Sequence, residues 1–230
     1  IADLTAARVE FLVGDRYYLK QMEAKKGNLV LGEFNFQTLV LPAIDILPLE
    51  TARKIVDFAK SGGRVYALAG LPSASAEKGM GDSRMKDLMA TLRSQPTFRA
   101  CPEEGLKPLL DRPAAGLASP VRFTSGAFPM LQHRRRIDGL DFFWLANNSD
   151  EWKECSIFIG GVHGVASVWD CETGAIRLVA SVDKSDGSEL ALVFKPYEAY
   201  WLVFNPMAAA LSAPPEHKPN FEVVATIAGP

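Results

Sequence analysis

The feature that most constrains this chain is a change of hydrophobic pattern near its middle. Up to about residue 93, apolar strand-like runs alternate with segments whose apolar residues recur at helical spacing. Beyond residue 120, short apolar runs follow one another about every 8–12 residues, with turn residues between them. Prolines and glycines interrupt regular structure between the two halves. We therefore predict two domains, residues 1–117 and residues 118–230.

A strand–helix–strand pattern dominates the first domain. Leu39–Leu41 and Arg64–Ala69 are continuous apolar runs, which are typical of strands buried on both faces. Between them, Leu49–Lys60 has apolar residues at helical spacing, with Pro48 before it and Gly62 after it. This short connection predicts two parallel strands with the helix packed on one face of the sheet. The first domain is expected to be α/β, with a flavodoxin-like parallel sheet.

Three further elements are expected in the first domain. Arg8–Val13 reads as a short strand, and Asp15–Lys25 as a helix that Asp15 caps at its start. Ser83–Arg93 reads as a second helix, after a loop of small and polar residues.

The second domain is expected to be an antiparallel β-sandwich. Its strands are predicted from short apolar runs separated by turn chemistry such as Asp138-Gly139. Asp170–Gly174 is predicted to be a hairpin loop, and Asp183–Gly187 a turn. The predicted strands are 142–147, 156–160, 165–169, 175–180, 189–194 and 199–204. Because Trp144, Trp169 and Trp201 lie inside such runs, we expect them in the core.

Composition excludes several classes of protein. With 48% hydrophobic and 10% aromatic residues, the chain can bury a core, which excludes intrinsic disorder. A net charge of −2 gives no overall field that favours nucleic acid or an anionic membrane. No apolar run is long enough to span a bilayer. Because the chain begins at Ile1 without a signal-peptide pattern, we expect it to be a piece of a longer protein.

No cofactor or metal site is expected. The sequence contains neither a Gly-x-Gly-x-x-Gly motif after a strand nor a Gly-Lys-Ser/Thr phosphate loop. Cys155, His163 and Cys171 lack the close ligand pairs that hold zinc. Cys155 and Cys171 either pair in an oxidising compartment or, as we favour, are buried free thiols, as is Cys101. The compartment therefore stays open.

No catalytic residue is assigned. Ser73 and Ser75 follow a predicted strand, but no histidine precedes His133 to act as their base. The carboxylate pairs fall in predicted turns, where acidic residues are ordinarily solvated, rather than in a cleft suited to glycoside hydrolysis. These pairs are Asp138/Asp141, Asp150/Glu151 and Asp170/Glu172.

Two exposed features are candidates for binding. The charge cluster begins with His133, Arg134 and Arg135, and alternation along a strand places His133 and Arg135 on the face opposite Arg134. We expect this cluster at a domain interface, with Arg134 or Arg135 bonded to an acidic side chain or carbonyl of residues 1–117, although a solvated strand edge remains the alternative. Trp152 lies in a polar loop, where an exposed indole could stack on a sugar ring, although packing against the sandwich is the alternative.

Three ordered blocks together resemble a known family. They are the strand–helix unit at 39–65, the segment 132–147 with His133-Arg134 and Asn147, and Trp169-Asp170-Cys171-Glu172-Thr173-Gly174. They resemble the region that follows the catalytic barrel in large glycoside hydrolases of the family 106 α-L-rhamnosidase type. In that family an amidotransferase-like α/β module leads into a β-sandwich with HR…YF…N and WDxxTG motifs. The chain departs from these motifs at Phe142-Phe143-Trp144 and at Cys171, changes that strands and hairpins tolerate.

The resemblance implies that hydrolysis belongs to the parent protein. The acid and base carboxylates of such enzymes lie in the barrel, upstream of this region, and no position here corresponds to them. Ala43 and Leu71 occupy the plausible nucleophile positions of the amidotransferase-like module, which is therefore expected to be inactive. The partner implied is the parent's catalytic barrel, and the parent is compatible with a periplasmic or secreted location.

Three functional hypotheses follow. The first is a non-catalytic accessory portion of a multidomain, rhamnosidase-like glycoside hydrolase. The second is a self-contained carbohydrate-binding or assembly module, with exposed aromatic residues or a sheet edge as the contact. The third is a small hydrolase that uses Ser73 or Ser75 as its nucleophile.

Overall fold

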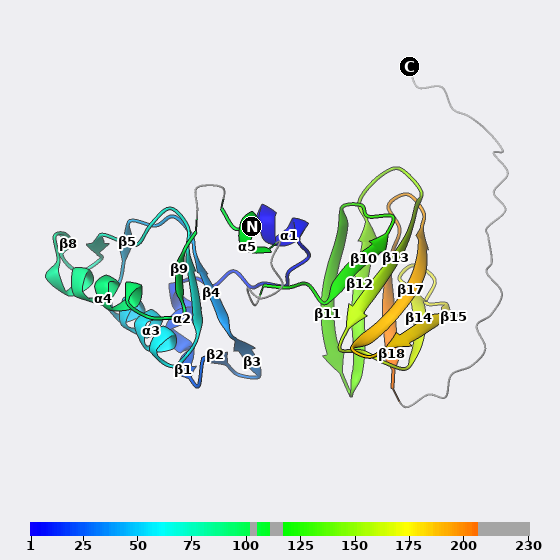
Figure 1. Cartoon of the computed structure of the whole chain (residues 1–230), viewed down its shortest axis with the longest axis horizontal. Helices are drawn as coiled ribbons and strands as arrows, with labels where there is room; N and C mark the ends of the chain where they lie inside the picture. Colours follow the sequence, from blue (N-terminus) through cyan, green and yellow to red (C-terminus); the bar gives the residue numbers. More distant parts are fainter. Residues whose placement is uncertain (102–104, 111–116, 207–230) are drawn as a thin grey trace, which may run out of the picture. The chain divides into compact units, whose positions relative to one another are not determined.

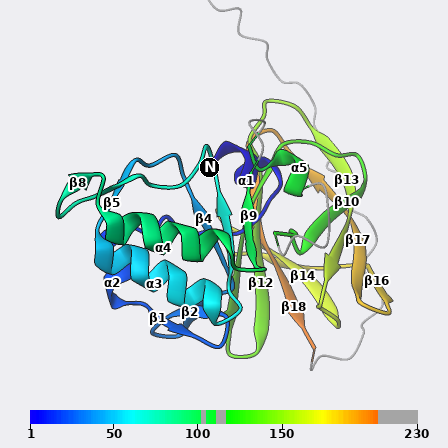
Figure 2. The same ribbon diagram turned by 60° about the vertical axis from the view of Figure 1, so that its left-hand side comes forward.

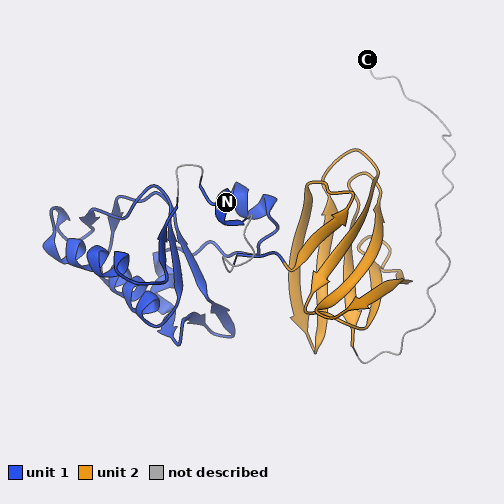
Figure 3. Ribbon diagram, viewed as in Figure 1, with its two compact units in different colours: residues 1–119 blue, residues 120–230 orange. Residues whose placement is uncertain are grey.

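The computed structural model describes residues 1–101, 105–110 and 117–206 (Figure 1). The chain divides into two compact units, Ile1–Ser119 and Pro120–Pro230 (Figure 3). The first contains helices with parallel and antiparallel sheets, and the described part of the second consists of antiparallel sheets. Among the described residues, none of the helices has the length and apolar character needed to cross a membrane.

A three-stranded parallel sheet lies at the centre of unit 1. Its order is β4 (Thr38–Leu41), β6 (Arg64–Ala67) and β9 (Phe98–Ala100). Leu39 is aligned with Val65 in the parallel pair β4–β6, as the strand–helix–strand pattern predicts. Helices α3 (Leu49–Lys60) and α4 (Ser83–Arg93) lie side by side against this sheet (Figure 2).

Both faces of the central sheet are covered. Ile55, Phe58 and Met85 of α3 and α4 are at most 1% exposed and form one core with Val65. On the other face, Tyr66 packs in a smaller cluster with residues near the short helices α1 (Ala2–Ala6) and α5 (Lys107–Leu110). Both faces of the sheet are therefore buried, as its continuous apolar strands require.

The ends of α3 show how side chains fix this layer. Pro48 precedes the helix and has no side chain that can cap it. The Glu77 carboxylate takes this role and accepts a hydrogen bond from the Leu49 amide at 3.0 Å. After the helix, Gly62 has a φ of +103° and turns the chain toward β6. A Cβ at Gly63 would lie 2.0 Å from the Phe58 ring, so only glycine fits there.

The N-terminal segment differs from its prediction. Arg8–Val13 forms no strand, and Leu12 and Val13 are exposed, so this expectation is wrong. Asp15 does cap a helix, α2, but that helix covers only Arg16–Gln21. The chain then forms a small antiparallel sheet of β1 (Glu23–Lys25), β2 (Asn28–Leu31) and β3 (Phe34–Phe36).

The small sheet explains why the helix stops early. Gly27 and Gly32 have positive φ in the turns that join its strands. Met22 and Leu29 join the core of unit 1, so tertiary burial outweighs the helical propensity of residues 22–25. A second small sheet contains β5 (Ile46–Leu47), β7 (Ala74–Ser75) and β8 (Gly79–Met80).

Unit 2 contains two antiparallel sheets that share one core. The four-stranded sheet has the order β10 (Val121–Ser125), β13 (Lys153–Gly160), β17 (Gly187–Phe194), β16 (Ser181–Lys184). The five-stranded sheet has the order β11 (Met130–Ile137), β12 (Leu140–Asn147), β18 (Ala199–Asn205), β14 (Val165–Asp170), β15 (Ile176–Val179). Their inward side chains, such as Phe143, Ile157, Phe194 and Leu202, form one buried cluster. The predicted antiparallel strands are therefore present.

Two details of unit 2 correct the sequence-based expectations. Strand β16 occupies residues 181–184, so the turn expected at Asp183–Gly187 begins two residues later. Trp144, Trp169 and Trp201 are absent from the buried core, and each is only partly buried. Their expected place in the core is wrong, because they lie on the outer face of the five-stranded sheet.

Candidate functional site

A row of aromatic residues crosses the outer face of the five-stranded sheet. Strand pairing aligns His133 with Trp144, Trp144 with Trp201, and Trp201 with Trp169. Directly paired residues in a sheet point to the same face, so these four side chains form one continuous row. Phe143, adjacent to Trp144, points the other way and is fully buried in the core. The row therefore lies opposite the sandwich interior.

These side chains line a hollow of about 540 Å³. We call it the aromatic hollow, and its lining residues all belong to unit 2: His133, Arg135, Ile137, Phe142, Trp144, Trp169 and Trp201. Its volume lies within the range of about 300–1,000 Å³ found for small-molecule sites, which are mostly apolar with a few polar groups.

Phe142 holds the aromatic rings in edge-to-face contact. Its ring centroid lies 5.5 Å from that of Trp169 and 6.1 Å from that of Trp201, with interplanar angles of 86° and 82°. Val203 pairs with Phe142 on the same face and is only 2% exposed, because these large side chains cover it. The Trp169 indole nitrogen donates to the Ser167 hydroxyl at 3.0 Å. The apolar surface of the hollow is therefore held by ring packing and a hydrogen bond.

Polar groups enter the hollow from one strand, β11. His133 and Arg135 are both exposed, and the Arg135 Nε donates to the His133 Nε2 at 3.2 Å. This bond requires His133 Nε2 to be an acceptor, so the neutral ring carries its proton on Nδ1. The hollow has one cationic edge and no carboxylate among its lining residues.

Arg134 lies on the opposite face from His133 and Arg135, as strand alternation predicts. Its guanidinium donates to the Asp141 carboxylate and lies 5.3 Å from the centroid of the Phe143 ring. One arginine therefore has a carboxylate partner, but this partner belongs to the same sheet and not to residues 1–117, where it was expected. The assignment of His133, Arg134 and Arg135 to a domain interface remains a prediction.

Trp152 lies in the loop between β12 and β13, outside the residues that line the hollow. It is 45% exposed. The buried Asn147 amide nitrogen donates to the Glu151 carbonyl at 2.7 Å and to the Lys195 carbonyl at 2.9 Å. This amide joins the Trp152 loop to the β17–β18 loop, which presents the exposed Tyr197. A sugar contact by Trp152 remains a prediction.

The serines considered as nucleophiles are placed in structural contacts. The buried Ser75 hydroxyl donates to the Asp82 carboxylate at 2.6 Å, and Arg84 donates to the same group at 2.8 Å. These hydrogen bonds hold the pKa of Asp82 well below its usual range, and the bond from Arg84 has the larger effect. Ser73 lies 3.6 Å from the Met80 sulfur. Asp82 also caps α4, so this cluster stabilises the start of that helix.

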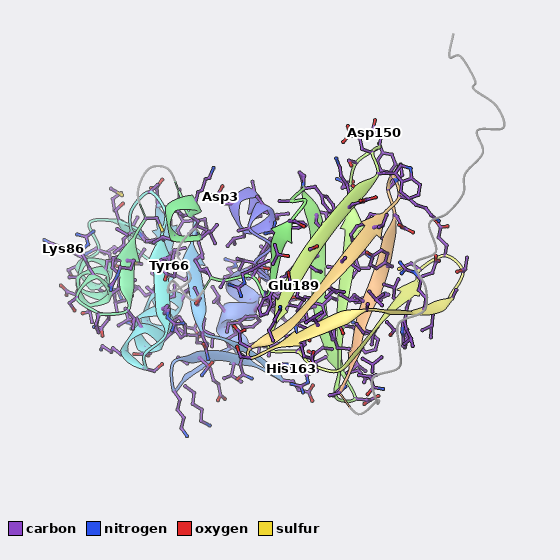
Figure 4. All side chains as sticks on the ribbon, turned by 45° about the vertical axis from the view of Figure 1, so that its right-hand side comes forward. Asp3, Tyr66, Lys86, Asp150, His163 and Glu189 are labelled. Atoms are coloured by element: carbon purple, nitrogen blue, oxygen red, sulfur yellow. The ribbon has the colours of Figure 1, made fainter. Side chains whose placement is uncertain are left out.

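The acidic pairs of unit 2 likewise stabilise loops. Asp170 accepts the backbone amides of Glu172 and Thr173 at 2.9 and 2.8 Å, which lowers its pKa and closes the hairpin. Glu151 forms an ion pair with Lys153. Asp150 lies at one end of the sandwich and His163 at the other (Figure 4).

All three cysteines are free thiols. Cys155 is buried as expected, but Cys171 is exposed and Cys101 is intermediate, so the expected burial of these two thiols is wrong. Burial raises the pKa of the Cys155 thiol to about 11. The described part of the chain contains no group of three or more histidine, cysteine or acidic side chains placed to hold a metal.

Comparison with known proteins gives a shared fold. No protein-family model matches the chain, and no curated protein does either. A rhamnosidase from Novosphingobium sp. PP1Y matches 90% of this chain at 17% identity with a TM-score of 0.66. The chain spans only 21% of that rhamnosidase. An exo-carrageenase of family GH42 from Bacteroides ovatus matches 82% of this chain and 26% of its own, at 13% identity and a TM-score of 0.43.

Of these two matches, the one to the rhamnosidase is close enough to show a shared fold. It establishes that the chain has the fold of a region within a glycoside hydrolase.

The aromatic hollow was not predicted from the sequence. The sequence feature that could have revealed it is a strand with bulky apolar residues on both faces. In β12, Phe142 and Trp144 point to one face, and Phe143 and Leu145 point to the other. Such a strand is apolar on its outer face too.

Proposed function

We propose that this chain is a non-catalytic accessory portion of a glycoside hydrolase of the family 106 α-L-rhamnosidase type. The observation that carries the proposal is the rhamnosidase match, which covers 90% of this chain but only 21% of the other. A region of that size within a larger enzyme is suited to supporting a catalytic domain. Unit 1 then corresponds to an amidotransferase-like module without a nucleophile.

The bonding of the candidate acidic groups supports an accessory role. Asp141 is paired with Arg134, Asp170 closes a hairpin, and Glu151 is paired with Lys153. Glycoside hydrolysis needs two carboxylates that face a sugar, one of them with a raised pKa. The pKa values of Glu151 and Asp170 are instead lowered, by the Lys153 ion pair and by backbone amides respectively.

The partner in this proposal is the catalytic barrel of the same protein. His133, Arg134 and Arg135 belong to strand β11 at one edge of the five-stranded sheet, where a neighbouring domain can reach them. Arg134 is already satisfied by Asp141, so His133 and Arg135 are the groups available for a new contact. A neighbouring domain would gain hydrogen bonds from Arg135.

Hydrolysis assays test the accessory role. Purified chain should not release nitrophenol from nitrophenyl α-L-rhamnoside or other aryl glycosides, whereas a longer protein that contains the barrel should. Variants Asp141→Asn, Asp170→Asn and Glu151→Gln of the chain control for trace activity. Turnover by the chain alone that disappears in one of these variants would refute the proposal.

Carbohydrate binding is the second candidate function. The observation that favours it is the aromatic hollow, whose three indoles form one row on an outer face. Exposed Trp152 provides a separate aromatic surface. The third hypothesis, a serine hydrolase, has no such support, because the buried Ser75 hydroxyl donates to a carboxylate that also caps a helix.

A further inference from the structure

We propose that the aromatic hollow binds a pyranose ring of a glycan, with one oxygen-bearing edge of the sugar against Arg135. The inference goes beyond the accessory role and does not require it. A chain that supports a catalytic barrel can lack this site, and a sugar-binding chain can act without a barrel.

The apolar surface of the hollow suits one face of a sugar ring. A pyranose carries several C–H groups on one face, and an indole offers them a broad, electron-rich surface. Trp144, Trp201 and Trp169 lie on three adjacent strands, so their Cα atoms span a distance of about 10 Å at the usual strand spacing. That span is long enough for more than one sugar unit.

The polar edge of the hollow suits the rim of the same ring. Arg135 uses its Nε to donate to His133, and this is its one partner among the described residues. The two terminal guanidinium nitrogens therefore remain as donors that face no protein acceptor. The lining residues include no carboxylate, so a ligand bound in the hollow can supply the acceptor. A sugar hydroxyl or a uronate carboxylate supplies such an acceptor.

The arrangement favours a sugar over a protein partner. Protein interfaces commonly have an apolar centre with polar residues around the rim. Here His133 and Arg135 both come from β11, and four of the seven lining side chains are phenylalanine or tryptophan rings. A ligand with one apolar face and one polar edge matches this one-sided arrangement. The volume of about 540 Å³ also falls in the range of small-ligand sites.

Fluorescence titration of the complete chain tests the proposal. The probes are cellotriose, trigalacturonic acid and methyl α-L-rhamnoside, so that neutral and acidic sugars are compared. We expect at least one probe to change tryptophan emission saturably and to protect the indoles from acrylamide quenching. Trp201→Ala should weaken that binding at least tenfold, and Trp201→Phe should weaken it less because a ring remains.

Arg135 variants identify the edge contact. Arg135→Gln is an exposed substitution that should leave the fold intact, which circular dichroism checks. If a carboxylate is the acceptor, the variant should weaken the binding of trigalacturonic acid at least tenfold and the binding of cellotriose less. If a hydroxyl is the acceptor, it should weaken the binding of both probes equally. Tyr17→Ala, which removes an exposed aromatic ring of unit 1 outside the hollow, is the matched control and should leave every affinity unchanged.

Three results would overturn the proposal. One is the absence of saturable binding by all three probes up to their solubility limits. Another is binding that Trp152→Ala abolishes and Trp201→Ala leaves intact, which would move the site to the loop. The third is self-association in sedimentation that Trp201→Ala removes, without sugar binding, which would make the face a protein contact. The hydrolysis assays above give a separate readout for the accessory role.

Discussion

Arg134 donates to a single oxygen of Asp141, from Nη2 at 2.7 Å and from Nε at 3.2 Å, across the β11–β12 hairpin. Their side chains are 29% and 12% exposed, and the guanidinium also covers the Phe143 ring. The run of three arginines is therefore not a uniform basic patch. One arginine stabilises an edge of the sandwich, while Arg135 faces the aromatic hollow.

Replacing Arg134 tests that division. Arg134→Ala should lower the free energy of unfolding of unit 2 by about 1–3 kcal/mol, because it leaves a mostly buried carboxylate without its donor. All four tryptophans lie in unit 2, so tryptophan fluorescence during urea unfolding reports on this unit alone. The neighbouring Arg135→Ala, on the opposite face of the strand from Arg134, is the control and should change little. Equal losses in both variants would contradict the assigned role of Asp141.

Thiol reactivity tests the state of the cysteines. In the native chain at pH 8, exposed Cys171 should react first with a thiol-specific disulfide reagent, and Cys155 only after unfolding. Burial blocks access to Cys155 and raises its pKa to about 11, which keeps the thiolate scarce.

Two controls complete the thiol experiment. Cys171→Ser should remove the fast phase and leave the slow one. Without reductant, the unfolded chain should titrate three thiols. A single thiol would instead show that two of the cysteines are joined in a disulfide, and peptide mapping would show whether they are Cys155 and Cys171.

Acid should weaken unit 1 through Asp82. Its folded-state pKa is lowered by Arg84 and Ser75, so its contribution to stability is complete above the unfolded-state pKa of about 4. That contribution is lost as the pH falls below this value toward the folded-state pKa. The helical circular dichroism signal, which comes mainly from α3 and α4 of unit 1, should therefore melt at lower temperature between pH 5 and pH 2.

Substitution separates Asp82 from general acid denaturation. Asp82→Asn should be less stable than the original chain at pH 7, and its melting temperature should fall less on acidification. Asp87→Asn removes an exposed carboxylate from the same helix and should retain the full acid dependence. An unchanged acid slope in Asp82→Asn would show that other groups govern it.

Local sequence patterns predicted the elements whose stabilising contacts are themselves local. Leu49–Lys60 is a helix because its apolar residues recur on one face, and the structure buries that face. The Asp170–Gly174 hairpin follows from contacts within five residues, namely the Asp170 carboxylate on two amides and a Gly174 φ of +71°. The parallel pairing of Leu39–Leu41 follows from a short crossover connection.

Features that depend on distant pairing were not predicted. The aromatic row exists because β12, β14 and β18 align Trp144, Trp169 and Trp201, which are separated along the chain by other strands. Each strand has bulky apolar residues on both faces, so alternation alone cannot say which set faces the core. The helix expected at residues 15–25 ends early because Met22 packs into the distant core of unit 1.

We expect the side chain of Asn147 to make a large contribution to the stability of the sandwich. It is 1% exposed, its nitrogen donates to the carbonyls of Glu151 and Lys195, and its oxygen accepts the Ser149 hydroxyl at 2.7 Å. Asn147→Ala should cost about 1–3 kcal/mol, because two carbonyls lose a buried donor. Asn147→Asp should cost more, since a carboxylate of the same shape then faces both carbonyl oxygens.

Hydrogen exchange distinguishes a local effect from general destabilisation. Under native conditions Asn147→Asp should raise exchange in the loops at 148–152 and 195–198 before it affects strand β13. The Tyr197 amide, which donates to the Ser149 carbonyl at 3.0 Å, should lose protection first because it links the same two loops. Ser149→Ala removes a hydroxyl but keeps both carbonyl contacts, so it should cause a much smaller change. If Ser149→Ala equals Asn147→Asp, the amide of Asn147 is not what joins the two loops.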